Sequence, residues 1–387
     1  MEPKLRVFYI SSSKGTSVSM KVFSAKKVFV WLSWGMVFLV VLEFCVRFED
    51  LIKWDAPFFG PYSHEILWQP TAWGNGGRPN ARFEKWKINS HGFRSGEIGQ
   101  SKPTYKIRIL VMGASETFGL YESPGHDFPE LLDKDLNGIF PNCYNVINTG
   151  FPGMSLPRMC QFFEKVVKTL QPDVVVVYPS PQFYLDMKVP SEKTFANFNF
   201  LERNEERKFE PRLKRKLKIV LKKILPPSLQ TLIRRLIIEY TRNQLGIREA
   251  WERPPPKRLA AFQRHLERLV QEIKAMGCQV ILATHANRFG TCLDGVNVFH
   301  MYAWILYYPS VTPLGMLKME ESANDMIRKV AAKYRVSVAD LADILSGRSE
   351  NFADFSHFTD EGSRKVAEVL SKAIINLISP EHNGVCH

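Results

Sequence analysis

The fold is decided by one stretch of the chain, Ile107-Arg-Ile-Leu-Val-Met-Gly113-Ala-Ser-Glu-Thr-Phe-Gly119. Its first six residues are mainly apolar and end at a glycine, which is typical of a buried parallel strand that turns into a helix. Similar apolar runs recur downstream, and segments with helical spacing of apolar residues lie between them. Strands that alternate with helices predict an α/β fold with a parallel sheet. The further strands are expected at 144–147, 174–178, 279–283 and 336–339, and the helices at 156–170, 258–276, 316–333 and 361–378.

Ser115, within this stretch, is a candidate nucleophile. A serine on the turn between a strand and a helix has an exposed hydroxyl and backbone amides nearby. Such amides can stabilise the oxyanion that forms when a carbonyl is attacked. A Gly-x-Ser turn also caps helices for structural reasons alone. The turn by itself therefore leaves both roles open.

A second motif near the other end of the chain, Asp354-Phe-Ser-His357, favours the catalytic role. It precedes Thr359-Asp-Glu-Gly362, which predicts the start of the last helix. A carboxylate three residues before a histidine can bind one imidazole nitrogen and leave the other free to act as a base. We therefore expect Ser115 as nucleophile, His357 as base and Asp354 as the orienting acid. The hydroxyl and the imidazole should lie within about 3–4 Å of each other.

Together these two motifs resemble the SGNH/GDSL hydrolase family. The G-D-S-x-T-x-G block of the family is matched by residues 113–119, with Ala114 in place of the aspartate. Its D-x-x-H block is matched by Asp354 and His357. The resemblance covers about residues 105–379, and a basic insert interrupts it. It implies a three-layer α/β/α sandwich of flavodoxin-like type, with the site at the C-terminal ends of the strands.

The other two blocks of the family concern the oxyanion hole. The segment after the second apolar run looks like the block whose glycine amide joins that hole, with Gly153 as the better candidate and Gly150 as its neighbour. After the third run the family has G-x-N-D, but this chain has Tyr178-Pro-Ser-Pro-Gln-Phe-Tyr184 and no asparagine. Ser180 or Gln182 is the alternative donor. Loss of one donor costs about a hundred- to a thousandfold in turnover.

Two more segments are expected near the site. His285 follows the fourth apolar run, where it either lines the substrate pocket or is a hydrogen-bonded structural histidine, and the second role is favoured. Asn89-Ser-His-Gly-Phe-Arg94 resembles a segment of membrane-anchored bacterial members of the family. It is interpreted as an ordered turn that packs on the main domain.

The N-terminal part contains an apolar run, Val28 to Val46, whose single charged residue is Glu43. At 1.5 Å per residue, a helix of this length spans a hydrocarbon core of about 30 Å. Glu43 can pair with Arg47 one helical turn later. Six basic residues and one acidic residue precede the run, so the N-terminus is expected in the cytoplasm and the rest outside. A cleaved signal peptide and a buried core helix are the alternatives to an uncleaved anchor.

The formal net charge is +13, and the insert carries much of it. Between residues 212 and 235 there are nine Lys or Arg and no acid, with apolar residues at helical spacing and a break at Pro226-Pro227. The charge is expected to contact a membrane, whereas the apolar stripe is expected to pack on the domain. The predicted organisation is a basic cytoplasmic tail (1–27), a transmembrane anchor (28–48), an irregular connector (49–104), a catalytic domain in two parts (105–187 and 258–387) and the helical insert (188–257).

Three functions remain on sequence grounds. The first is a serine esterase that acts on an acylated envelope glycan or lipid, and the second is an O-acyltransferase that modifies an envelope or secreted polysaccharide. The third is a non-catalytic glycan-binding or scaffold protein. No metal or organic cofactor is expected, and no nucleic acid partner. None of the six cysteines forms a C-x-x-C pair. Single structural thiols are favoured, and a disulfide between Cys278 and Cys292 is the alternative.

Overall fold

The structure is a computed structural model that describes residues 25–60, 62–99, 102–185, 212–290 and 297–378. The central sheet contains β5 (Ile107–Gly113), β6 (Tyr144–Asn148), β7 (Val174–Tyr178), β8 (Gln279–Ala283) and β9 (Ser337–Ala339). The helices around it are α2 (Ser115–Phe118), α3 (Phe128–Ile139), α4 (Leu156–Lys165), α7 (Pro256–Ala275), α8 (Val298–Ile305), α9 (Pro313–Tyr334), α10 (Leu341–Leu345) and α11 (Asp360–Leu377). The N-terminal part contributes α1 (Ala25–Trp54), β1 (Trp68–Thr71), β2 (Gly74–Gly77), β3 (Arg82–Phe83) and β4 (Trp86–Lys87), and the insert contributes α5 (Arg212–Ile224) and α6 (Pro227–Gln244). Short 3-10 helices lie at His64–Leu67, Val167–Leu170, Pro181–Tyr184 and Ser349–Asn351.

The central sheet is parallel throughout, in the order β6-β5-β7-β8-β9. All five predicted strands are present. Since they run in one direction, the segments that follow them meet at one edge of the sheet, where sites form in folds of this type. β5 lies between β6 and β7, so the turn after β5 is flanked by the loops that follow these two strands.

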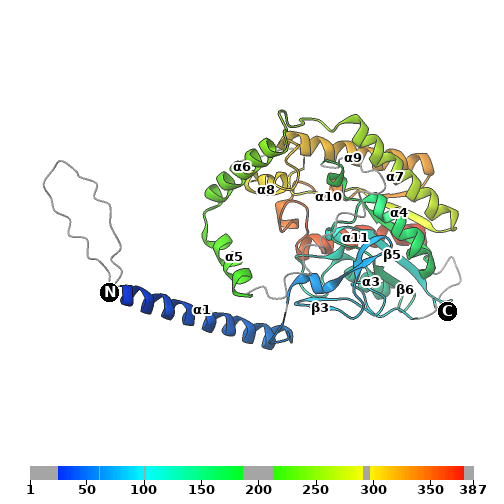
Figure 1. Ribbon diagram of the computed structural model, residues 1–387. Coiled ribbons are helices and arrows are strands. Elements are labelled where there is room, and N and C mark those ends of the chain that lie inside the picture. Colours follow the sequence, from blue (N-terminus) through cyan, green and yellow to red (C-terminus); the bar gives the residue numbers. More distant parts are fainter. Residues whose placement is uncertain (1–24, 61, 100–101, 186–211, 291–296, 379–387) are drawn as a thin grey trace.

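Helices cover both faces of the sheet, so the α/β/α sandwich is confirmed (Figure 1). β7 shows why both faces need cover. Val174, Val176 and Tyr178 belong to the apolar core on the side of α3 and α11, whereas Val175 and Val177 belong to the core on the side of α4, α7 and α9. Successive side chains of a strand point to opposite faces, so an apolar run of this kind is stable only between two layers.

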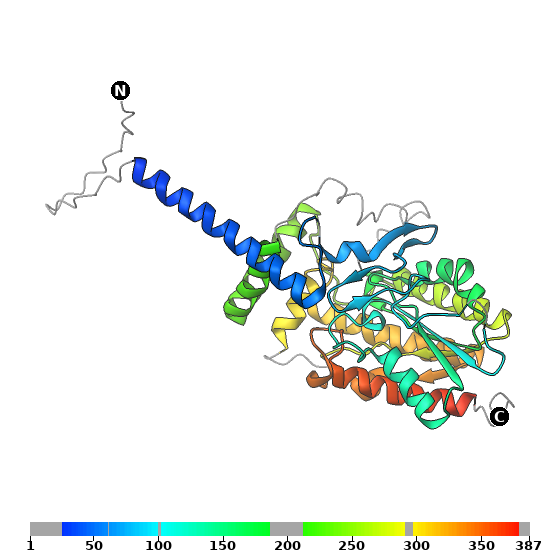
Figure 2. The ribbon, with the colours of Figure 1, turned by 90° about the horizontal axis from the view of Figure 1, so that it is seen from below.

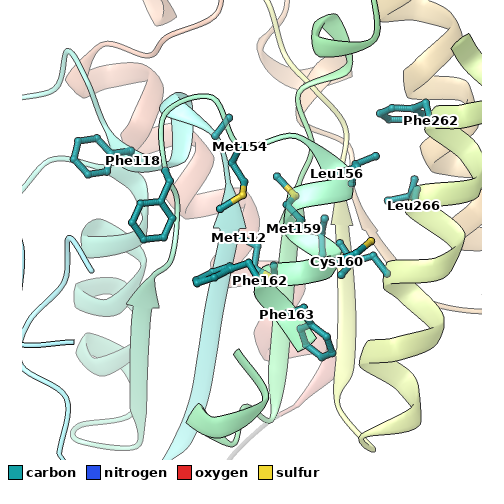
Figure 3. Close-up of a cluster of buried hydrophobic side chains, with 14 of the residues drawn as sticks. Met112, Phe118, Met154, Leu156, Met159, Cys160, Phe162, Phe163, Phe262 and Leu266 are labelled. Atoms are coloured by element: carbon teal, nitrogen blue, oxygen red, sulfur yellow. The ribbon is translucent and has the colours of Figure 1, made fainter. Parts of the chain in front are cut away.

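The core beneath α4 fixes the loop that precedes this helix. Phe162 of α4 lies toward Met112 of β5, and Cys160 lies toward Phe262 and Leu266 of α7 (Figure 3). All five side chains are at most 1% exposed. Burial of a large apolar side chain contributes about 1.5–3 kcal/mol. This packing therefore anchors the start of α4 and, with it, the preceding loop on the sheet.

The connector is more regular than its sequence indicates. α1 continues to Trp54, and two short antiparallel hairpins follow, β1 with β2 and β3 with β4. Strands of two to four residues are too short to show an alternating pattern, and β2 consists of Gly-Asn-Gly-Gly. The hairpins pack on the main domain through aromatic pairs such as Trp68 with Phe118 and Trp73 with Phe151, at 5.3 and 5.1 Å between ring centroids.

The insert forms the two predicted basic helices, but one expectation is wrong. The apolar stripe of α5 does not pack on the domain: Leu217, Val220 and Leu221 are about half exposed, and Ile224 is 70% exposed. α6 is held on the domain through α8, and Ile238 is its buried residue. The sequence shows that a helix is amphipathic, but not whether another layer covers its apolar side.

α1 is long and apolar enough to cross a membrane. The predicted pair between Glu43 and Arg47 is present at 2.7 Å. Of the cysteines, Cys160 and Cys278 are buried free thiols, so Cys278 does not form the alternative disulfide. Cys143 is disulfide-bonded, contrary to the favoured expectation of single thiols.

Candidate active site

Ser115, His357 and Asp354 form one hydrogen-bonded chain at the C-terminal edge of the sheet. Ser115 is the first residue of α2, directly after β5. Its Oγ lies 2.9 Å from Nε2 of His357. Nδ1 of the same imidazole lies 2.8 Å from Oδ2 of Asp354. The structure thus brings the three predicted residues together at the expected spacing, although 242 positions separate the serine from the histidine.

The loop itself holds the Asp354 carboxylate in place. Oδ1 of Asp354 accepts the backbone N–H groups of Ser356 and His357, both at 3.0 Å. The backbone N–H of Ala353 donates to the carbonyl of His357 at 2.8 Å and closes the turn. Thr359 then caps α11 by accepting the N–H of Gly362, which explains the Thr-x-x-Gly spacing after the motif. A D-x-x-H spacing therefore presents acid and base together.

The charges of the triad stabilise one another. Burial lowers the pKa of His357, but the hydrogen bond and the negative charge of Asp354 outweigh burial and raise that pKa above its ordinary value. Burial raises the pKa of Asp354, but its hydrogen bond to His357 outweighs this and lowers the pKa. Asp354 therefore stays ionised and holds the proton on Nδ1, so that Nε2 faces the hydroxyl as an acceptor.

Aromatic rings surround the imidazole. The ring of Tyr121 lies 5.3 Å from that of His357, and the ring of Phe355 lies 5.8 Å away. Trp304 of α8 stacks on Phe355 at 5.2 Å, and Tyr307 lies at 6.1 Å from it. Tyr121 and Tyr307 are more than half exposed. Apolar ring faces thus border the solvent side of the base.

Glu116, the residue after the nucleophile, is buried and is the main feature that sequence reasoning missed. Its carboxylate accepts hydrogen bonds from Ser356 Oγ at 3.0 Å and from Ser180 Oγ at 3.2 Å, and lies 3.5 Å from Nε2 of Gln182. Oε2 also lies 3.4 Å from Ser115 Oγ. The two side chains predicted as oxyanion donors therefore face this carboxylate. No sequence signal marks Glu116 as buried, since it occupies the variable position of its motif.

His285 lies between two carboxylates. Its Nδ1 lies 2.6 Å from Oε2 of Glu320, and its Nε2 lies 3.5 Å from Oε1 of Glu116. The side-chain amide of Asn324 accepts the backbone N–H of His285 and donates to its backbone carbonyl. The ring of Tyr178 stacks on the imidazole of His285. Burial lowers the pKa of His285, but the charge of Glu320 and the hydrogen bonds of both carboxylates outweigh it and raise the pKa to about 10. His285 is fully buried with a carboxylate at each ring nitrogen, and its interpretation as a structural histidine stays a prediction.

The two glycines predicted for the oxyanion hole differ in their surroundings. The N–H of Gly150 donates to Oδ1 of Asn148 at 3.0 Å and is therefore used within the loop. Gly153 adopts a positive φ of 74°. Arg158 fixes it by donating to its carbonyl at 3.1 Å and to the carbonyl of Asn75 at 3.1 Å. Gly153 remains the candidate for the oxyanion hole, and the connector helps to hold it.

The Asn89–Arg94 segment forms an ordered turn on the main domain, as expected, and its contact there is with the nucleophile turn. Oδ1 of Asn89 accepts the N–H groups of His91 and Phe93, both at 2.9 Å, which forms the turn. Arg94 at its end donates to the carbonyls of Phe118 and Gly119, the last residues of the nucleophile motif. It also pairs with Asp127 at 3.1 Å. The connector thus stabilises the turn that carries Ser115.

Comparison with known proteins finds solved structures whose sequence identity to this chain is low. No family description and no curated protein matches the chain. An acetyl xylan esterase, AlAXEase, is 15% identical over 70% of this chain and 100% of its own, with a TM-score of 0.42. A lipase/acylhydrolase from Enterococcus faecalis is 18% identical over 71% and 98%, with a TM-score of 0.42. A putative lipolytic protein of the G-D-S-L family from Desulfitobacterium hafniense DCB-2 is 12% identical over 69% and 99%, with a TM-score of 0.39. At these scores the matches assign no activity.

Gly119→Ala is expected to destabilise the protein more than Gly125→Ala. Both glycines have a positive φ near 80°, so alanine at either costs about 1–2 kcal/mol. A Cβ at Gly119 would also overlap with Arg94 and lie 2.6 Å from Cβ of Asp127, whereas a Cβ at Gly125 meets only the flexible ends of Glu130 and Lys134, at 3.2 Å. Thermal unfolding of both variants measures the difference, and equal losses would contradict the bracing role of Arg94.

Proposed function

We propose that this protein is a membrane-anchored serine ester hydrolase that acts through an acyl-enzyme. The observation that carries the proposal is the continuous chain from Ser115 Oγ to His357 Nε2 at 2.9 Å and from His357 Nδ1 to Asp354 at 2.8 Å. A nucleophile, a base in hydrogen-bond reach and a group that orients the base are the parts that nucleophilic catalysis needs.

The mechanism follows from this geometry. Nε2 of His357 takes the proton of Ser115 Oγ as this oxygen attacks the ester carbonyl carbon, and the ionised Asp354 stabilises the imidazolium. The backbone amides of Ser115 and Gly153 are the proposed donors to the oxyanion. His357 then protonates the leaving alcohol. A water molecule, deprotonated by His357, attacks the acyl-enzyme and releases the acid and free Ser115.

The proposed substrate is an acylated envelope glycan or lipid. α1 would hold the catalytic domain at a membrane surface, where such esters occur. The exposed rings of Tyr121 and Tyr307 near the base suit either a sugar face or an acyl chain, since aromatic faces pack on both.

The proposed topology is an uncleaved span with a cytoplasmic N-terminus. The excess of basic residues before α1 supports this orientation.

Transfer of the acyl group to a glycan hydroxyl is the second candidate. It uses the same triad but must keep water from the acyl-enzyme, and the rings of Tyr121 and Phe355 around His357 favour limited water access. Acetate release and acetyl-oligosaccharide formation, measured in one reaction with an acetyl ester and an added oligosaccharide, separate the two. Hydrolysis in excess of transfer supports the proposal, and the reverse supports the transferase.

The pH dependence of hydrolysis tests the role of the base. Only neutral His357 can accept the proton, and Asp354 raises its pKa above 6.5, so kcat/KM for a soluble acetyl ester should rise with pH through an inflection above 6.5. Asp354→Asn removes that charge, so the inflection should move down and kcat should fall about 10⁴-fold. An inflection that stays in place in Asp354→Asn would show that another group is the base.

A further inference from the structure

The described part of the insert, from Arg212 onward, starts beside the C-terminal end of the apolar run of α1. The carboxylate of Glu43 accepts the backbone N–H groups of Arg212 and Leu213, the first residues of α5, at 3.1 and 2.8 Å. Asp50, near the end of α1, pairs with Arg215 at 3.2 Å. α5 contacts α1 and crosses it in the view of Figure 2, whereas in the view of Figure 1 it lies beside α1. Since Glu43 lies in the last turn of the apolar run, α5 begins near the level where α1 would leave a membrane.

Both helices of the insert expose apolar side chains at helical spacing. Each of these side chains is between 40% and 70% exposed. Exposed apolar side chains gathered on two successive helices in this number mark an interaction site rather than ordinary solvent exposure. Its members are Leu217, Val220, Leu221 and Ile224 of α5 and Leu229, Leu232, Ile233, Leu236, Ile237 and Tyr240 of α6.

The charge of the insert divides into two groups. Arg212, Arg215 and Lys216, in the first turns of α5, pair with acids of α1 or of the connector. Lys218, Lys222 and Lys223 are exposed, and across residues 25–60, 62–99, 102–185, 212–290 and 297–378 no carboxylate pairs with them. The second group therefore remains available to an anionic partner.

We propose that α5 and α6 dock on an anionic lipid bilayer, with the apolar side chains in the interface and the lysines against lipid phosphates. This inference rests on the proposed membrane span of α1, which brings the bilayer to this surface. A basic amphipathic helix that lies in the interface plane binds through buried apolar area together with attraction to anionic lipids. Each basic residue near an anionic leaflet contributes about 1 kcal/mol; on the proposed topology this is the outer leaflet, so the attraction requires anionic lipid there.

Docking of the insert would be transmitted to the active site. Arg234 of α6 donates to the carbonyl of Phe299 in α8 at 2.7 Å, and Arg235 lies over the ring of Tyr302 at 4.4 Å. α8 in turn stacks Trp304 on Phe355, two residues before His357. A docked insert would thus fix the distance between the bilayer and the catalytic loop.

The experiment uses the full chain in lipid nanodiscs, with Cys45→Ser and an environment-sensitive fluorophore on Leu221→Cys. Ile139→Cys, an apolar position of similar exposure (56%, against 48% at Leu221) at the end of α3, is the matched control. Quenching by nitroxide-labelled lipids reports contact with the bilayer. In discs that contain phosphatidylglycerol, we expect the probe at 221 to be quenched several-fold more than the probe at 139. In phosphatidylcholine alone the difference should largely disappear.

The triple variant Lys218→Gln, Lys222→Gln, Lys223→Gln should lose the quenching in anionic discs and keep hydrolysis of a soluble ester. Equal quenching at 221 and 139, or equal quenching in both lipids, would overturn the inference. Co-elution of the chain with the discs is measured in the same samples, and its loss would overturn both the span and this inference. Hydrolysis of the soluble ester reports separately on the active site, so the failures are distinguishable.

Discussion

Ser115→Ala is expected to lower kcat for a chromogenic acetyl ester by about four to six orders of magnitude. The variant removes the oxygen that lies 2.9 Å from His357 Nε2, so no acyl-enzyme can form. The remaining oxyanion donors can still bind the ester, so KM should change much less than kcat. Initial rates with the purified full chain in detergent measure both constants.

The control for this variant is Ser349→Ala. Ser349 is an exposed serine at the start of the 3-10 helix that precedes the D-x-x-H motif, and its contacts with Arg288 and the N–H of Phe352 are made by its backbone carbonyl, which alanine retains. This variant should retain wild-type kcat and thermal stability. Comparable activity of Ser115→Ala and wild type would rule out Ser115 as the nucleophile.

The second large effect concerns stability. His285→Gln is expected to destabilise the protein by about 3–5 kcal/mol, because it leaves Glu116 and Glu320 as buried carboxylates without a cation between them. For a domain of this size, that corresponds to a fall in Tm of roughly 6–20 °C. Tryptophan fluorescence during heating measures it. His265→Gln, which loses one hydrogen bond to Tyr184, should cost only about 0.5–1.5 kcal/mol.

The pH dependence of this effect has a defined sign. The pKa of His285 is raised from 6.5 to about 10 in the folded state, so its stabilisation is complete below pH 6.5 and is lost as the pH rises through about 10. The difference in Tm between wild type and His285→Gln should therefore be largest near pH 6 and shrink toward pH 10. A difference that is constant or grows over this range would mean that His285 is neutral in the folded protein.

The sequence predicts the central sheet well because buried parallel strands are nearly continuous apolar runs. β7 consists of four valines and a tyrosine, and its bounds are as expected. α3 was not predicted, although Phe128, Leu131, Leu132, Leu136 and Ile139 recur at helical spacing and Asp127 caps the helix, so its signal was present in the sequence and was missed. The hairpins of the connector were not predicted, because their strands are too short to show an alternating pattern.

The candidate site also contains residues that the sequence predicts and residues that it does not. Ser115 and the pair Asp354–His357 are predictable because each lies in a local motif at a helix start. The contacts of His285 with Glu116 and Glu320 are not predictable, because they join residues that are 169 and 35 positions apart, respectively. They depend on how β8 and α9 pack. Burial decides the role of each polar side chain in this cluster, and burial is set by tertiary packing rather than by local sequence.

The most direct test of the central claim is covalent labelling of the nucleophile. The full chain is treated with a fluorophosphonate, which reacts with an activated serine, and the modified peptide is identified by mass spectrometry. We predict one adduct, on Ser115, and its loss in His357→Ala, because the hydroxyl is activated only by the imidazole in contact with it. No adduct on Ser115 in wild type, or equal labelling in His357→Ala, would contradict the account.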